Sequence, residues 1–143
     1  MNIMKRNLDM LAAAAMLVLG MAALALAQSG GFHFFGPLSR VLTPNSDGVN
    51  DYAIFCFDNP SDSEVSGKVY SLLGSLVAEL GPRSGVASPP PGGAGAVACP
   101  GGFAPQYSFW DGKADGRAVS SGVYLYRIEA EGLSFKGTLL VVR

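Results

Sequence analysis

The chain has 143 residues, with 10 Lys and Arg against 11 Asp and Glu and a net charge of −1. This balance, without a basic cluster, argues against a nucleic-acid-binding protein and against a protein that binds anionic membrane surfaces. About 116 residues follow the N-terminal segment described next, which fits one domain with a single core.

Residues 1–27 have the pattern of a secretory signal peptide. Lys5 and Arg6 precede a long apolar run, and Ala25-Leu26-Ala27 provides the small-residue pattern that signal peptidase accepts. We therefore expect export through the Sec pathway, a mature N-terminus at Gln28 and no membrane span after cleavage. The alternative is an uncleaved anchor, because the run approaches the roughly 20 residues that span a bilayer. The absence of Cys at the cleavage site excludes a bacterial lipoprotein anchor.

Residues 28–41 form a short aromatic lead-in, in which Phe32, Phe34 and Phe35 surround His33. We expect this lead-in to precede the folded domain, which then spans residues 42–143. An alternative role is that the lead-in adds as a strand to a neighbouring molecule.

Residues 42–143 contain short β-like runs separated by turn signals, which is typical of an all-β sandwich. The expected strands are Tyr52–Phe57, Val65–Ser71, Leu76–Leu80, Phe109–Trp110, Val123–Ala130 and Leu133–Val142. The run from 123 to 130 alternates strictly, so Tyr124 and Tyr126 oppose Val123 and Leu125. We expect an immunoglobulin-like β-sandwich of about seven strands, without a helix of ordinary length after the leader.

Residues 81–105 differ in composition, because half of them are Gly or Pro and Arg83 is their only charge. Such a segment lacks the donors and side chains that regular structure requires. We expect a long surface loop without regular structure.

Cys56 and Cys99 are the two cysteines of the chain. In an exported protein an even pair predicts one disulfide, which would fasten the Gly/Pro-rich loop to the strand that contains Cys56. The alternative is a buried free thiol at Cys56, within an apolar run.

Asn45, Asp47 and Asp51 place three oxygen-bearing side chains around Gly48, as the start of a calcium loop does. The position where a calcium loop has its bidentate Glu is Cys56, so a Ca²⁺ site would need another acid, such as Asp58 or Asp111. The alternative is that Asn and Asp bend the backbone through Asx-turns. The turn interpretation is favoured.

Trp110-Asp111-Gly112-Lys113 has the composition of a structural corner, in which Trp110 enters the core while Asp111 and Gly112 turn the chain. Gly122 and Tyr124 then begin the next strand. We interpret these residues as a fold signature.

Three segments together resemble the C-terminal sorting domain of gliding-motility and type IX secretion cargo proteins, and the related immunoglobulin-like domain of flagellar hook-capping proteins. They are Leu42-Thr43-Pro44-Asn45-Ser46-Asp47-Gly48-Val49-Asn50-Asp51, Trp110-Asp111-Gly112-Lys113 and Lys136-Gly137-Thr138-Leu139-Leu140-Val141-Val142-Arg143. The resemblance implies a non-catalytic module in secretion or cell-surface attachment. It also implies protein partners in the export machinery or cell envelope, and a closing strand with Lys136, Gly137 and Arg143 that acts in sorting.

Catalysis gains no support from the residues. His33 is the only histidine, and the carboxylates at Asp47, Asp51, Asp111 and Asp115 lie in turn contexts rather than across a cleft. Apart from Ca²⁺, no cofactor is expected.

The short lead-in leaves almost no cargo for a sorting domain to carry. Three interpretations stay open: a small exported protein that is itself the cargo, a stand-alone structural or adhesive subunit that self-associates, or a remnant of a longer protein. An adhesive subunit could bind carbohydrate through its tyrosines, which are Tyr52, Tyr70, Tyr107, Tyr124 and Tyr126.

Overall fold

The structure is a computed structural model that describes residues 31–81, 84–85 and 97–143. The predicted signal peptide, residues 82–83 and residues 86–96 of the predicted loop lie outside the described residues. The described part is all-β. Its strands are β1 (His33–Pro37), β2 (Val41–Leu42), β3 (Ala53–Asp58), β4 (Ser66–Ser71), β5 (Leu76–Glu79), β6 (Ser84–Gly85), β7 (Pro105–Trp110), β8 (Lys113–Ala114), β9 (Arg117–Ala118), β10 (Gly122–Ala130) and β11 (Leu133–Val141).

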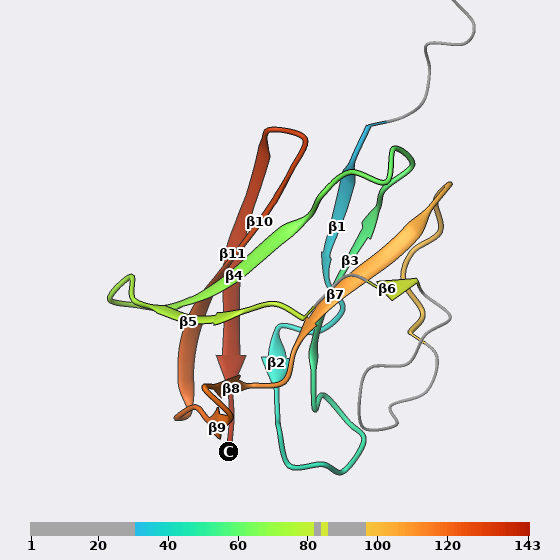
Figure 1. The fold of residues 1–143 in the computed structure, drawn as a ribbon. Helices are drawn as coiled ribbons and strands as arrows, with labels where there is room; N and C mark the ends of the chain where they lie inside the picture. Colours follow the sequence, from blue (N-terminus) through green and yellow to red (C-terminus); the bar gives the residue numbers. More distant parts are fainter. Residues whose placement is uncertain (1–30, 82–83, 86–96) are drawn as a thin grey trace, which may run out of the picture. The chain divides into compact units, whose positions relative to one another are not determined.

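Two larger sheets and one small hairpin contain these strands (Figure 1). The four-stranded sheet has the order β1-β3-β7-β6, and its neighbouring strands are antiparallel. The five-stranded sheet has the order β2-β11-β10-β4-β5, and it is antiparallel except where β2 runs parallel to β11. The hairpin consists of β8 and β9. No helix among the described residues is long and apolar enough to cross a membrane.

The two larger sheets share one hydrophobic core, as a sandwich requires. The four-stranded sheet contributes Phe55 and Phe57, and the five-stranded sheet contributes Tyr126 and Ile128. The rings of Phe55 and Tyr126 join the two layers, with centroids 4.9 Å apart. Alternation along β10 therefore has the predicted phase, with Tyr124, Tyr126, Ile128 and Ala130 toward the core.

A second, smaller core lies behind the four-stranded sheet. Because side chains alternate along a strand, Cys56 points away from the face that carries Phe55 and packs with Val97 and Tyr107. Cys56 and Cys99 form the predicted disulfide, with their Cα atoms 5.5 Å apart. The bond fastens the segment 97–104 over this face, which explains why β3 is buried on both sides.

The carboxylate of Asp58 holds the other end of the same segment. It accepts hydrogen bonds from the backbone N–H groups of Phe103 (3.1 Å) and Ala104 (2.6 Å). Next to it, the buried amide of Asn59 donates to the carbonyl of Ser63 and to Oε1 of Gln106. The Asp58 bonds satisfy two backbone N–H groups in a segment that has no sheet partner.

The boundary at residue 42 is corrected, because the sandwich begins ten residues earlier than the sequence indicates. His33–Pro37 is a strand of the four-stranded sheet, and Phe32 is only 5% exposed. Phe32 contacts the rings of Phe57 and Phe135, so it bridges the two sheets. Gly36 and Pro37 are uncommon in strands, so the sequence pattern does not indicate a strand here. An edge strand tolerates proline because the backbone groups on its outer side have no neighbouring strand to pair with.

Residues 81–105 also contain more regular structure than expected. Ser84–Gly85 forms β6, and β7 already begins at Pro105, whereas the predicted strand begins at Phe109. Gln106 and Tyr107 pair with both β3 and β6. The physical reason is tertiary: two-residue strands have no periodicity of their own and form only against an existing neighbour.

Replacing Phe32 by alanine tests whether the lead-in belongs to the core. We expect Phe32→Ala to lower the free energy of unfolding by about 2–4 kcal/mol, because a buried aromatic ring is lost. Urea denaturation followed by tryptophan fluorescence measures this change. Phe103→Ala is the matched control, because Phe103 is 90% exposed and its loss should leave stability unchanged. Equal stability of the two variants would contradict a core role for Phe32.

Candidate functional site

The loop between β2 and β3 is organised by the side chain of Asp51. One carboxylate oxygen, Oδ1, accepts hydrogen bonds from the backbone N–H groups of Asn45 (3.1 Å) and Ser46 (2.6 Å). The other, Oδ2, accepts from Gly48 N–H at 2.7 Å. A single carboxylate therefore satisfies three backbone donors in a loop that leads from one sheet to the other.

Asp47 and Asn45 complete this loop. Oδ1 of Asp47 accepts from Val49 N–H (2.8 Å), and Oδ2 accepts from the Asn45 side-chain amide (2.9 Å). Oδ1 of Asn45 accepts from Asp47 N–H (3.0 Å), which is an Asx-turn. The Val49 N–H, followed by the Asn45 amide, holds the pKa of Asp47 below its ordinary value.

These bonds give the predicted calcium residues a structural role. The structure does bring Asn45, Asp47 and Asp51 together, but their oxygens already accept hydrogen bonds from within the loop. Asp58 binds backbone N–H groups elsewhere, and Asp111 binds Lys113. Within the described ranges, no three His, Cys, Asp or Glu side chains are grouped as a metal site requires. The turn interpretation accounts for the geometry without Ca²⁺.

The corner at Trp110 connects the core to the β8–β9 hairpin. The buried Trp110 ring packs edge-on against Tyr124, with centroids 5.5 Å apart, and its Nε1–H donates to the carbonyl of Lys113. The Tyr124 hydroxyl donates to the carbonyl of Ser120. Oδ1 of Asp111 accepts from Lys113 N–H, which tightens the turn.

Gly112 allows this corner to lie against the strand that precedes the 43–51 loop. Its φ is +71°, and a Cβ there would lie 3.1 Å from Cδ2 of Leu42 and 3.1 Å from Cγ of Pro44. Val119 N–H donates to the Gly112 carbonyl, which closes the turn. Gly122, the other signature glycine, begins β10 opposite Val141.

The predicted sorting strand is β11, and its residues have different surroundings. Lys136 is exposed on the outer face of the five-stranded sheet. Gly137 lies beneath the Tyr126 ring of the neighbouring strand, where a Cβ would collide with that ring. Arg143 follows the strand, and its N–H donates to the Ser121 hydroxyl at 3.0 Å.

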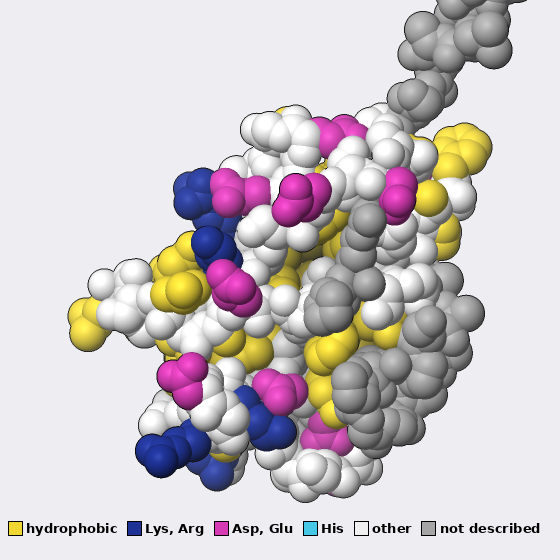
Figure 2. Space-filling view, viewed as in Figure 1, with side chains coloured by type: hydrophobic (Ala, Val, Ile, Leu, Met, Phe, Trp, Pro, Cys, Tyr) yellow, Lys and Arg dark blue, Asp and Glu magenta, His cyan; other side chains and the backbone are white. Residues whose placement is uncertain are grey.

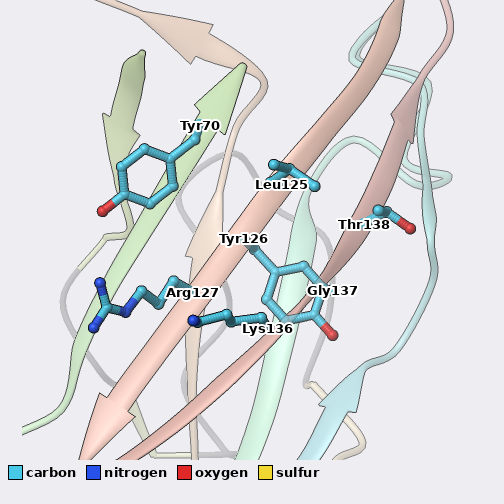
Figure 3. A pocket seen from close by; sticks show the side chains of 7 residues that line it. All are labelled: Tyr70, Leu125, Tyr126, Arg127, Lys136, Gly137 and Thr138. Atoms are coloured by element: carbon cyan, nitrogen blue, oxygen red, sulfur yellow. The ribbon is translucent and has the colours of Figure 1, made fainter. Parts of the chain in front are cut away.

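A shallow groove of about 450 Å³ lies on this outer face. Its lining residues are Tyr70, Leu125, Tyr126, Arg127, Lys136, Gly137 and Thr138. Figure 3 shows that the lining residues come from β4, β10 and β11. Tyr70, Leu125 and Thr138 are register neighbours on these three adjacent strands. Arg127 forms an ion pair with Glu129 and donates from Nε to the Ser134 hydroxyl (3.2 Å). No ion pair engages Lys136 within the described part of the chain.

The tyrosines do not form one continuous surface. Tyr107 and Tyr126 are buried, and Tyr124 packs against Trp110. Tyr52 contacts Phe109, and Tyr70 lies on the opposite sheet. A five-tyrosine sugar platform is therefore excluded by their positions.

The turn at Glu131 and Gly132 is predictable from the sequence, but sequence reasoning missed the role of the Glu131 carboxylate. Glu131 and Gly132 form the two-residue turn between β10 and β11, with φ of 49° and 75°. Two-residue hairpin turns favour Asn, Asp or Gly. The unusual glutamate at this position was therefore the sequence signal that its side chain has a particular role. Its carboxylate accepts from Phe32 N–H (2.9 Å) and from the Ser63 hydroxyl (2.7 Å), which joins three separate segments.

Replacing Asp51 by asparagine tests the organisation of the 43–51 loop. In the asparagine variant, an NH₂ group takes the place of the Oδ2 atom that accepts from Gly48 N–H. The Gly48 N–H therefore loses its acceptor. We expect Asp51→Asn to lower the free energy of unfolding by about 1–2 kcal/mol, measured by urea denaturation. Addition of calcium should leave the melting temperature of the unmodified protein unchanged. A rise in melting temperature with calcium, absent in Asp51→Asn, would instead establish a metal site.

Glu131 also predicts a pH dependence of stability. The Phe32 N–H, followed by the Ser63 hydroxyl, lowers the pKa of Glu131 below its ordinary 4.5. Its stabilising contribution is therefore present above pH 4.5 and disappears as the pH falls through the lowered value. We expect Glu131→Gln to be less stable at pH 7, and its difference from the unmodified protein to shrink as the pH falls below 4.5 and through the lowered pKa.

Urea midpoints at a series of pH values between about 7 and 3 measure this effect. Glu64→Gln, in the exposed part of the loop before β4, is the matched control and should follow the unmodified protein at every pH. A constant difference between Glu131→Gln and the unmodified protein would contradict the prediction.

Comparisons with protein-family models, curated proteins and solved structures find no match to this chain. The resemblance to sorting domains therefore rests on the three sequence segments alone.

Proposed function

We propose that residues 31–143 are a non-catalytic, immunoglobulin-like module of an exported protein, of the kind that type IX secretion cargo proteins have at their C-terminus. The module acts in secretion or cell-surface attachment by binding a protein partner of the export machinery or cell envelope. The bound element is the terminal strand β11.

The observation that carries this proposal is the convergence of the three resembling segments at one end of the sandwich. The 43–51 loop follows β2 directly, and β2 pairs with the end of β11 through Leu140 and Val141. The corner glycine, Gly112, lies against Leu42. Segments that are far apart in sequence thus form one structural unit, as parts of a single recognised module should.

The edge of β11 supports strand addition as the binding mode. Leu140 N–H donates to the carbonyl of Arg40, and Val142 N–H donates to the carbonyl of Leu42. These two N–H groups therefore point away from β10. By alternation, the N–H groups of Lys136 and Thr138 point to the same side, where β2 provides no partner. An open strand edge of this kind accepts an extended segment of another protein.

One further observation agrees with export: the Cys56–Cys99 bond belongs to the class of disulfides that persist in oxidising compartments.

His33, the only histidine of the chain, packs edge-on against the ring of Phe35, with 4.8 Å between the centroids. This aromatic contact agrees with the non-catalytic part of the proposal.

A stand-alone structural or adhesive subunit is the second candidate. It is favoured by the apolar side chains that the five-stranded sheet exposes on its outer face, such as Val123 and Leu140.

A proline at Thr138 tests strand addition. Deleting β11 would remove the buried Leu139 and Val141, so a loss of delivery would only report unfolding. Thr138→Pro removes one edge donor while the ladder to β10 uses other groups. We expect the folded variant to accumulate in the periplasm, with surface and medium fractions reduced about tenfold if edge binding drives delivery.

Thr138→Val is the matched control, because it retains the N–H and should be delivered normally. Circular dichroism and thermal melting establish that both variants are folded. Normal delivery of folded Thr138→Pro would overturn the edge-binding mode.

A further inference from the structure

The outer face of the five-stranded sheet is patterned in rows across its strands. Register and alternation give four rows, each written from β11 toward β5 as far as it extends: Leu140–Val123, Thr138–Leu125–Tyr70–Leu76, Lys136–Arg127–Lys68–Glu79, and Ser134–Glu129–Ser66. The first two rows are mostly apolar and the third is charged. The core uses the opposite side chains of the same strands, so these rows have no role inside the described domain.

The apolar rows are partly open to solvent, with Leu125 and Tyr70 half-buried at their centre. Val123 is 40% exposed, Leu140 is 42% exposed, and Leu76 is 53% exposed. The β4–β5 hairpin adds Leu72 and Leu73, which are 65% and 95% exposed. Figure 2 shows hydrophobic side chains at this projecting hairpin, with Lys and Arg side chains nearby. Contiguous apolar surface bordered by charge marks an interaction site.

We propose that this face binds the same face of a second copy of the chain. The pairing uses a two-fold axis that runs along the strands, between β10 and β4. Such an interface is isologous, so each contact occurs twice. Sheets that pack in this aligned way lie about 10 Å apart, as the two sheets of a sandwich do.

The two-fold arrangement matches apolar residues with apolar residues. Leu125 of one copy faces Tyr70 of the other, and Thr138 faces Leu76. The groove between Leu125 and Thr138 then receives an apolar side chain of the second copy.

The two ends of the charged row are complementary under the same operation. Lys136 lies on β11 and Glu79 lies on β5, at opposite ends of the row, so the axis places each opposite the other in the second copy. Neither side chain has an ion-pair partner within the described residues. Arg127, near the axis, is already paired with Glu129, which limits its repulsion by Lys68 of the second copy.

The size of the face sets the strength of the pairing. Four strands about 4.8 Å apart and the first three rows, about 6.7 Å apart, give roughly 400 Å² per copy, against about 800 Å² for a standard interface. We therefore expect a reversible dimer that dissociates on dilution.

Sedimentation velocity on protein produced from the full chain, purified after export, tests the pairing. We expect the mass to rise from monomer to dimer between about 1 and about 500 µM, because the interface lies at the small end of the specific range. Leu125→Ser and Leu76→Ser should each raise the dissociation constant at least about tenfold. Val49→Ser is the matched control, because Val49 is also exposed but lies in the 43–51 loop. Thermal melting establishes that each variant is folded.

A charge exchange identifies the arrangement. Lys136→Glu alone and Glu79→Lys alone should weaken the dimer, and the double variant should restore it. Several outcomes overturn the proposal: a monomer at the highest concentration, a dimer that Val49→Ser weakens as much as Leu125→Ser, or no restoration in the double variant. A monomer that instead sediments with lipid vesicles would also overturn it. These outcomes are independent of delivery to the surface, because association is measured on purified protein.

Discussion

Nine register pairs join β10 to β11, from Gly122 opposite Val141 to Ala130 opposite Leu133, and the other elements are arranged around this ladder. Its inner face provides Tyr126, Ile128 and Leu139 to the core. In the turn of this ladder, the Glu131 carboxylate accepts a hydrogen bond from Phe32 N–H, and the far end of β11 pairs with β2. Strict alternation sends the side chains between these core residues to the outer face of the sheet. The outer rows are therefore a direct consequence of the inner ones.

The same requirement is met differently in the four-stranded sheet. There β3 also has two apolar faces, but the chain covers the second face itself with the segment 97–104. The disulfide at Cys56 and the carboxylate of Asp58 hold that segment in place. One sheet thus has a covalently attached cover, whereas no described segment covers the outer apolar face of the other sheet. This asymmetry is the reason to look for a partner on the five-stranded sheet.

Sequence patterns predicted much of this fold because long strands have a local signature. The alternation from Val123 to Ala130, the apolar run around Cys56 and the turn at Gly112 were all visible without coordinates. The sequence did not reveal elements that exist only through distant partners. β2 and β6 are two residues long and have no period, and β1 is interrupted by Gly36 and Pro37.

The geometry of the candidate site was likewise predictable where it depends on local sequence and unpredictable where it depends on distant partners. The clustering of Asn45, Asp47 and Asp51 was predictable from local spacing, but which donors their oxygens accept was not, because turn and cation site use the same residue types. The outer rows could be placed only once the register between β10, β11 and β4 was known.

The hydrogen bond from Phe32 N–H to Glu131 joins residues that are 99 positions apart. Phe32 and Phe34 also pack against Phe135, and β2 needs β11 as its neighbour. The first strands therefore have no stable position until the last strand has been synthesised, which makes folding late and slow. A chain that is cut before β11 would therefore lose more than its last strand, because β2 and the Phe32 segment would lose their partners as well.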